Sequence, residues 1–132
     1  MHEPVKHTSV VSDKLPKPAG PYSPGVVYDR LLFVSGQGAN NPATGKLVGT
    51  DVESQTEQVL KNIAAILEAS GSSLNHVIRC GVFLTEISDF SKMNAVYSRM
   101  FGDNRPARTT VQVAALPGPN LKVEIDAVAY IP

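Results

Sequence analysis

The sequence predicts an α+β fold in which two helices cover one face of a mixed β-sheet, and three observations support this class. Two segments have the apolar spacing of amphipathic helices. The segments around them are short and rich in apolar or β-branched residues, as strands are. In the last segment, residues 122–130, small apolar residues occupy every second position, as in a strand whose one face lies beneath helices. With 132 residues, 42% of them hydrophobic, the chain is expected to form a single domain over residues 1–132.

The chain before the first helix is expected to form two strands and two loops. A strand is predicted over residues 5–11, and a buried strand over residues 31–35, which Gly36 follows. Because proline fixes φ and lacks an N–H donor, the proline-rich residues 17–25 are predicted to be a loop. Residues 40–45 have the composition of a turn.

The first helix is predicted from its capping residues and its apolar stripe. Thr50 and Glu53 fit a capping box, whose side chains bind the free amide groups at a helix start. Gly71 is expected to end the helix as its C′ residue, because glycine adopts a positive φ at little cost. The stripe consists of Val52, Val59, Leu60, Ile63, Ala64 and Leu67.

The second helix is expected to follow a strand over residues 77–85. This helix is predicted to begin near Ser88 or Asp89 and to end at Gly102. Its apolar stripe consists of Phe90, Met93, Tyr97, Met100 and Phe101.

Two final strands, over residues 109–115 and 122–130, are separated by a turn at residues 117–120, so a hairpin is predicted. One face of the last strand is small and apolar and suits a position under the helices: Val123, Ile125, Ala127 and Ala129. The other face carries Glu124, Asp126, Val128 and Tyr130. Two helices cover only one face, so the second is expected to meet other subunits or a site between them.

The composition excludes several classes of protein. Lys plus Arg and Asp plus Glu both total 12, and without a basic excess nucleic acid is not an expected partner. The single cysteine, Cys80, excludes an intrachain disulfide and is expected to be a buried small hydrophobe. Residues 1–17 resemble neither a secretory signal nor a transit peptide, and no apolar run could span a membrane, so a cytoplasmic location is expected. No metal is predicted, because no metal-binding spacing joins His2, His7 and His76.

Two charged residues are the main candidates for chemistry. Arg108 stands where a loop enters a strand, and its planar guanidinium matches a carboxylate bidentately. It could equally be a surface arginine or a member of a structural ion pair. Glu124 lies within an otherwise apolar strand, where burial would raise its pKa and suit it to activate water. Strict alternation also allows it to be a solvent-facing residue.

Further polar groups could complete a site. Tyr22 projects from the proline-rich loop and could offer its hydroxyl to a ligand, or could pack down to close the loop. Ser35 and Gly36 end a strand where a ligand can approach the backbone closely. Asn94, in the second helix, could be a solvated residue or part of a nearby site. Asp126 shares a strand face with Glu124, so a carboxylate pair is conceivable.

Seven phrases of the sequence, taken in order, resemble the RidA (YjgF) family from about Pro18 to the C-terminus. They are AGPYS at 19–23, FVSGQ at 33–37, NPATG at 41–45, QVLKNI at 58–63, FSKMN at 90–94, PART at 106–109 and VEIDA at 123–127. The resemblance implies a chorismate-mutase-like two-layer sandwich that assembles as a homotrimer with ligand clefts between subunits. It also implies a 2-iminobutanoate/2-iminopropanoate deaminase without metal or cofactor, which clears imines released by pyridoxal-phosphate dehydratases.

The resemblance implies specific roles for the candidate residues. Arg108 would bind the substrate carboxylate, and Glu124 would hold the hydrolytic water. Tyr22 would form a hydrogen bond in the cleft, with lining or support from Ser35, Gly36 and Asn94. Thr110 stands where many active members have cysteine, which leaves its backbone N–H available but the range of imines open. The loop over residues 102–105 is also shorter than in many relatives, which leaves the pocket rim open.

Two other functions fit parts of the pattern. A non-catalytic trimeric binder of small carboxylates would use Arg108 equally well, and Glu124 is the residue that separates it from a hydrolase. A ribonuclease or translation inhibitor is the other alternative, against which the neutral net charge argues.

Overall fold

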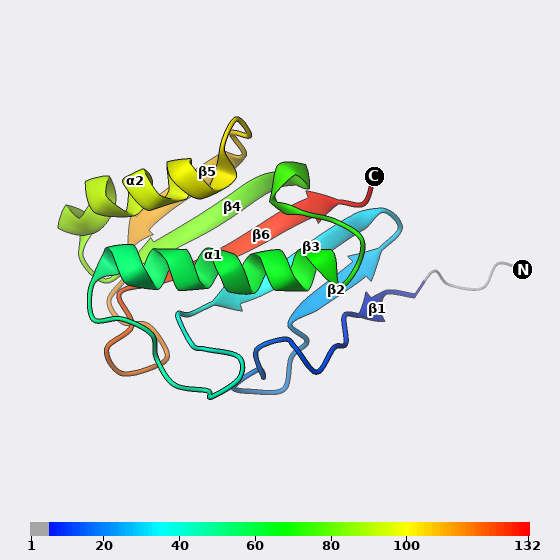
Figure 1. Ribbon diagram of the computed structural model, residues 1–132, viewed down its shortest axis with the longest axis horizontal. Coiled ribbons are helices and arrows are strands. Elements are labelled where there is room, and N and C mark those ends of the chain that lie inside the picture. Colours follow the sequence, from blue (N-terminus) through cyan, green and yellow to red (C-terminus); the bar gives the residue numbers. More distant parts are fainter. Residues whose placement is uncertain (1–5) are drawn as a thin grey trace, which may run out of the picture.

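The computed structural model describes residues 6–132, which form one six-stranded sheet with both helices on the same face (Figure 1). The predicted α+β class is therefore confirmed. The strands are β1 (Thr8–Ser9), β2 (Gly25–Tyr28), β3 (Leu31–Gln37), β4 (Val77–Leu84), β5 (Ala107–Gln112) and β6 (Val123–Tyr130). The helices are α1 (Val52–Glu68) and α2 (Phe90–Phe101), with short 3₁₀ turns at Leu74–His76 and Ile87–Asp89. None of the helices described has the length and apolar character needed to cross a membrane.

The strand order is β1-β2-β3-β6-β4-β5, and the predicted hairpin of the last two strands is wrong. Strand β5 pairs with β4 in parallel, and α2 supplies the crossover that such a pair requires. Strand β6 lies between β3 and β4, antiparallel to both. A central position gives β6 hydrogen-bond partners on both edges, whereas a hairpin with edge strand β5 would not.

The N-terminal strands differ from the prediction. Strand β1 has two residues rather than seven, and residue 5 of the predicted strand lies outside the described residues. Strand β2 was not predicted, although it contains the strand-forming residues Val26 and Val27. It pairs with β3 through a two-residue turn in which Asp29 has a φ of 57°. The proline-rich segment before β2 is a loop, as predicted.

Helix α1 begins one residue later than its predicted cap. Asp51, rather than Thr50, is the N-cap, and its Oδ1 accepts a hydrogen bond from the Ser54 N–H at 2.7 Å. The capping box of Thr50 and Glu53 is therefore wrong, because the ionised Asp51 carboxylate is the acceptor at the helix start. At the other end Gly71 has a φ of 81° and donates to the Glu68 carbonyl, which confirms it as the C′ residue.

The core lies between the sheet and the two helices. The predicted inward face of β6 is confirmed, because Val123, Ile125, Ala127 and Ala129 are at most 3% exposed. Most of the predicted α2 stripe is also inside, but Phe90 is 39% exposed. The opposite, open face of the sheet carries large apolar side chains that the protomer leaves uncovered: Tyr28, Leu31, Phe33, Val111 and Tyr130.

Candidate functional site

Arg108 lies on the helix side of the sheet. It is the second residue of edge strand β5 and pairs in register with the fully buried Cys80 of β4. Paired residues of adjacent strands project to the same face, so its side chain points toward α2. There its Cζ atom lies 4.7 Å from the ring centroid of Tyr97 and 5.5 Å from that of Phe90. Both distances allow a cation–π contact.

The guanidinium of Arg108 makes no hydrogen bond or ion pair with residues 6–132. Nearby arginines are different: Arg105 donates to the backbone carbonyls of Gly102 and Asn104, and Arg99 pairs with Glu57. Aromatic rings hold the Arg108 cation without neutralising it, so its donors stay free for an anion. The structural ion pair that the sequence left open is thus not formed within this part of the chain.

A cavity of about 240 Å³ opens beside Arg108, and Asn94 is one of the residues that line it. Its lining consists of Asn94, Tyr97, Ser98, Arg105, Pro106 and Arg108. Thr110 follows two residues after Arg108 on β5, so it shares this side of the strand, but it does not line the cavity. Arg108 therefore borders a small cavity that also contains side chains of α2.

Glu124 lies on the open face of β6, opposite to the helix side. It is partly buried, and burial, followed by the negative charge of Asp126, raises the pKa of its carboxyl group. Gly36 leaves the space that this carboxylate occupies: a Cβ atom on Gly36 would lie 2.5 Å from Glu124 Oε2. The carboxylate accepts no hydrogen bond from residues 6–132, so its oxygens remain available to water.

A bulge in β3 brings Ser35 and Gly36 to this carboxylate. Between the pairs Val34–Ala127 and Gln37–Ile125, β3 has two residues where β6 has only Asp126. The Ser35 hydroxyl donates to the Ser23 carbonyl at 2.7 Å and so ties the proline-rich loop to β3. Ser35 therefore has a structural contact in addition to its predicted place in the lining.

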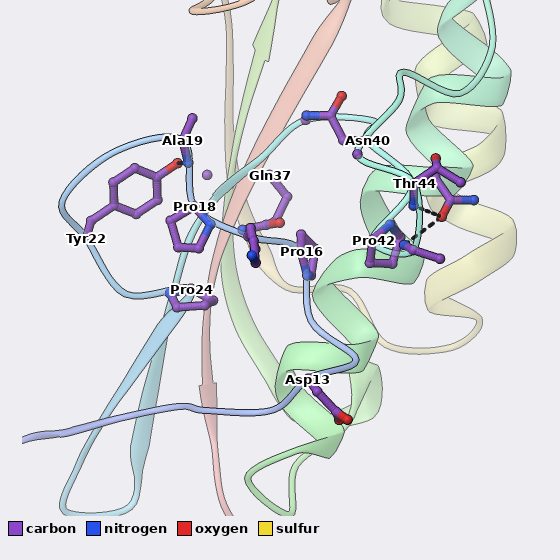
Figure 2. Close-up of a pocket in the computed structure, with 16 residues that line it drawn as sticks. Asp13, Pro16, Pro18, Ala19, Tyr22, Pro24, Gln37, Asn40, Pro42 and Thr44 are labelled. Atoms are coloured by element: carbon purple, nitrogen blue, oxygen red, sulfur yellow. Dashed lines mark hydrogen bonds between the residues drawn. The ribbon is translucent and has the colours of Figure 1, made fainter.

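Tyr22 lies at one wall of a second cavity, of about 400 Å³, between the proline-rich loop and residues 40–45 (Figure 2). Gly36, Gln37 and Gly38 lie between these two loops. The Tyr22 side chain is 50% exposed, and its oxygen accepts a hydrogen bond from the Ala19 N–H at 3.2 Å. Its hydroxyl proton is still free to donate to a ligand.

The candidate residues thus form two groups on opposite faces of one sheet. Gly36 and Glu124 lie together on the open face, with Ser35 next to Gly36 in the bulge, whereas Arg108, Asn94 and Thr110 lie on the helix side. Tyr22 shares the second cavity with Gly36 but not with Glu124. A single protomer does not bring Arg108 and Glu124 together.

Sequence reasoning missed three residues that shape these groups. Tyr97 and Phe90 were read only as parts of an apolar stripe, and that spacing carries no sign of a contact with Arg108. Gly81 donates its N–H to Asp126 Oδ1 at 2.7 Å and leaves room for that side chain. Asp126, on the same face as Glu124, adds its negative charge to the causes that raise the pKa of Glu124. The position of Gly81 in the middle of β4 could have indicated this close approach, because a glycine inside a strand often marks a place where another group comes near the backbone.

The fold defines a small α+β protomer that carries a free guanidinium on the helix side of its sheet and a partly buried carboxylate on the open face. A family model described as endoribonuclease L-PSP matches residues 12–131. The chain therefore belongs to this family, and the resemblance to RidA (YjgF) proteins is confirmed.

Three relatives show how close the similarity is. A RutC family protein from Pyrococcus horikoshii is 47% identical over 92% of this chain and 95% of its own. The human 2-iminobutanoate/2-iminopropanoate deaminase is 42% identical over 88% of this chain and 84% of its own. The crystal structure of Escherichia coli TdcF with bound serine is 36% identical, covers 93% of this chain and 98% of its own, and superimposes with a TM-score of 0.87. Relatives named as deaminases support an enzymatic activity of the same general kind.

Proposed function

We propose that this protein acts in the cytoplasm as a homotrimer that hydrolyses short 2-imino acids, such as 2-iminobutanoate and 2-iminopropanoate, to 2-keto acids and ammonia. The observation that carries the proposal is the partly buried Glu124 carboxylate, which has no hydrogen-bond donor among residues 6–132 and faces the space left by Gly36. The human relative is named for this reaction, and TdcF binds serine, an amino acid with the same carboxylate group as the imines.

The proposed site lies between subunits. Arg108 and Glu124 are on opposite faces of the sheet, so one subunit would supply the carboxylate anchor and its neighbour the water-holding group. The open sheet face supports assembly, because the exposed side chains of Tyr28, Leu31, Phe33, Val111 and Tyr130 would be buried against other copies. Closed rotational symmetry then repeats the same composite site at each interface.

The reaction proceeds in two stages. Arg108 binds the substrate carboxylate through two parallel hydrogen bonds and so fixes the adjacent C=N carbon. Glu124 accepts a hydrogen bond from water and takes its proton as the oxygen attacks this carbon. Attack on the protonated C=N group gives a carbinolamine, to whose nitrogen Glu124 returns the proton that it took from water. The C–N bond then breaks, ammonia leaves, and Glu124 accepts the proton of the carbinolamine hydroxyl as the C=O bond of the keto acid forms. The Tyr22 hydroxyl orients the attacking water or the leaving nitrogen through a hydrogen bond.

A coupled assay tests the proposal. A pyridoxal-phosphate dehydratase acting on threonine or serine generates the imine, and the appearance of the keto acid is followed with and without this protein. Faster keto-acid formation is expected, and an unchanged rate with tight binding of the keto acid would instead indicate a non-catalytic carboxylate binder. Several amino-acid precursors should be compared, because Thr110 stands beside the anchor and leaves the preferred imine open.

The family description makes ribonuclease activity the second candidate function. RNA cleavage by the same preparation, and RNA binding titrated at several salt concentrations, would test it directly. The formal net charge of zero argues against this function, because neutralisation of phosphates by an excess of basic residues supplies much of the affinity for nucleic acid.

Gly36→Ala should slow imine hydrolysis strongly without unfolding the protein. The new methyl group would lie 2.5 Å from Glu124 Oε2 and would push the carboxylate away from its water. Displacement of a catalytic group by about 1 Å can cost roughly 100-fold in rate. Gly118→Ala is the matched control, because its Cβ would meet only Leu121. Equal rates for Gly36→Ala and Gly118→Ala would contradict the placement of Glu124.

A further inference from the structure

We propose that Tyr97 and Phe90 form an aromatic bracket that positions Arg108, with Tyr97 as the main positioning residue. This inference rests on the proposed role of Arg108 as the carboxylate anchor. The bracket consists of two rings from α2, whose centroids lie 4.7 Å and 5.5 Å from the Arg108 Cζ atom. A guanidinium over a ring face keeps its edge free, so the same contact can hold the cation and leave its donors exposed.

The surroundings of Tyr97 suit a positioning role. Its side chain is only 7% exposed, and its ring packs at 4.5 Å from that of Phe101, so the core fixes the ring. A fixed ring defines one plane for the guanidinium, whereas an exposed arginine would sample many rotamers. Phe90 is 39% exposed and covers the guanidinium from the outer part of α2.

The ring, rather than the hydroxyl group, carries this role. The Tyr97 oxygen is buried and has no hydrogen-bond partner within residues 6–132, and burial raises the pKa of the phenol. The hydroxyl therefore stays neutral and contributes no charge to Arg108. Tyr97→Phe should preserve the bracket, and Tyr97→Leu should remove it.

The first measurement uses the side-chain NMR signals of Arg108 in the full-length protein. In the wild type and in Tyr97→Phe, the ring should shift the Arg108 Hδ and Hε resonances upfield. These shifts should collapse in Tyr97→Leu and decrease partly in Phe90→Leu. Upfield shifts that survive in Tyr97→Leu would overturn the proposal. This result does not depend on imine hydrolysis, so it separates failure of the bracket from failure of the proposed function.

The second measurement is the Kd for pyruvate, a 2-keto acid with the carboxylate of the proposed product. Tyr97→Leu should weaken pyruvate binding roughly tenfold, and it should raise KM more than it lowers kcat. Tyr97→Phe is the matched control, since it keeps the ring over Arg108 and removes only the hydroxyl group. Equal losses in Tyr97→Leu and Tyr97→Phe would overturn the bracket. If Tyr97→Leu does not fold, the Kd of Phe90→Leu for pyruvate is compared with that of the wild type instead, and a weaker affinity is again expected.

Discussion

Glu124→Gln should lower the kcat of imine hydrolysis by about 10²- to 10⁴-fold, which is the usual contribution of a positioned general base. Glutamine keeps the shape of the side chain and a hydrogen-bond acceptor, but it cannot take a proton from water. The rate of keto-acid formation in the coupled assay is the measurement. A variant with full activity would contradict the general-base role and leave Glu124 only a positional one.

The pH dependence of kcat in the wild type also tests the role of Glu124. Burial and Asp126 raise the pKa of Glu124 above its ordinary value near 4.5. The reactive carboxylate is therefore lost as pH falls through this raised pKa, and the acid limb of kcat should lie above pH 4.5. Asp126→Asn should move that limb to lower pH, because the neighbouring negative charge is removed.

Ionisation of Glu124 has opposite effects on activity and on folding stability: it is needed for activity, but it lowers stability. Because folding raises the pKa of Glu124, the folded state favours the protonated group, so its stabilising contribution is present at low pH and lost as pH rises through the folded pKa. Glu124→Gln should therefore be at least as stable as the wild type near pH 7. Thermal unfolding of both proteins would show that lost activity is not lost folding.

Arg108→Ala should reduce kcat/KM by about 10²- to 10³-fold, because truncating one partner of a hydrogen-bonded charge pair costs roughly 2–5 kcal/mol. Arg108→Lys should also be impaired, since an ammonium group cannot bind a carboxylate through a planar fork. The loss should appear mainly in KM and in the Kd for pyruvate, because Arg108 binds a group that does not react.

Arg99→Ala is the matched control for Arg108→Ala. It removes a cation from α2 whose partner is Glu57, with a distance of 3.6 Å between the charged atoms. Exposed pairs of this kind contribute little, so near wild-type kinetics are expected. Comparable losses in both variants would mean that overall charge, rather than carboxylate anchoring, governs activity.

The sequence predicted the helices and the inward face of β6 well, because both depend on local periodicity. It predicted the family from short segments that occur in the family's order. It did not predict strand order, because pairing of β5 with β4 is decided by the α2 crossover and not by the turn at residues 117–120. It placed Glu124 on the correct face from alternation alone. The contact of Arg108 with Tyr97 was out of reach, because it joins two elements whose relative position is fixed only by packing.

The central claim is that Arg108 of one subunit and Glu124 of another complete each site. Co-assembly of equal amounts of Arg108→Ala and Glu124→Gln subunits tests it most directly. Each variant alone should be nearly inactive, whereas randomly mixed trimers should recover about a quarter of wild-type activity, since half of the subunits supply each intact group. Mixed assemblies that stay as inactive as the separate variants would contradict a site shared between subunits.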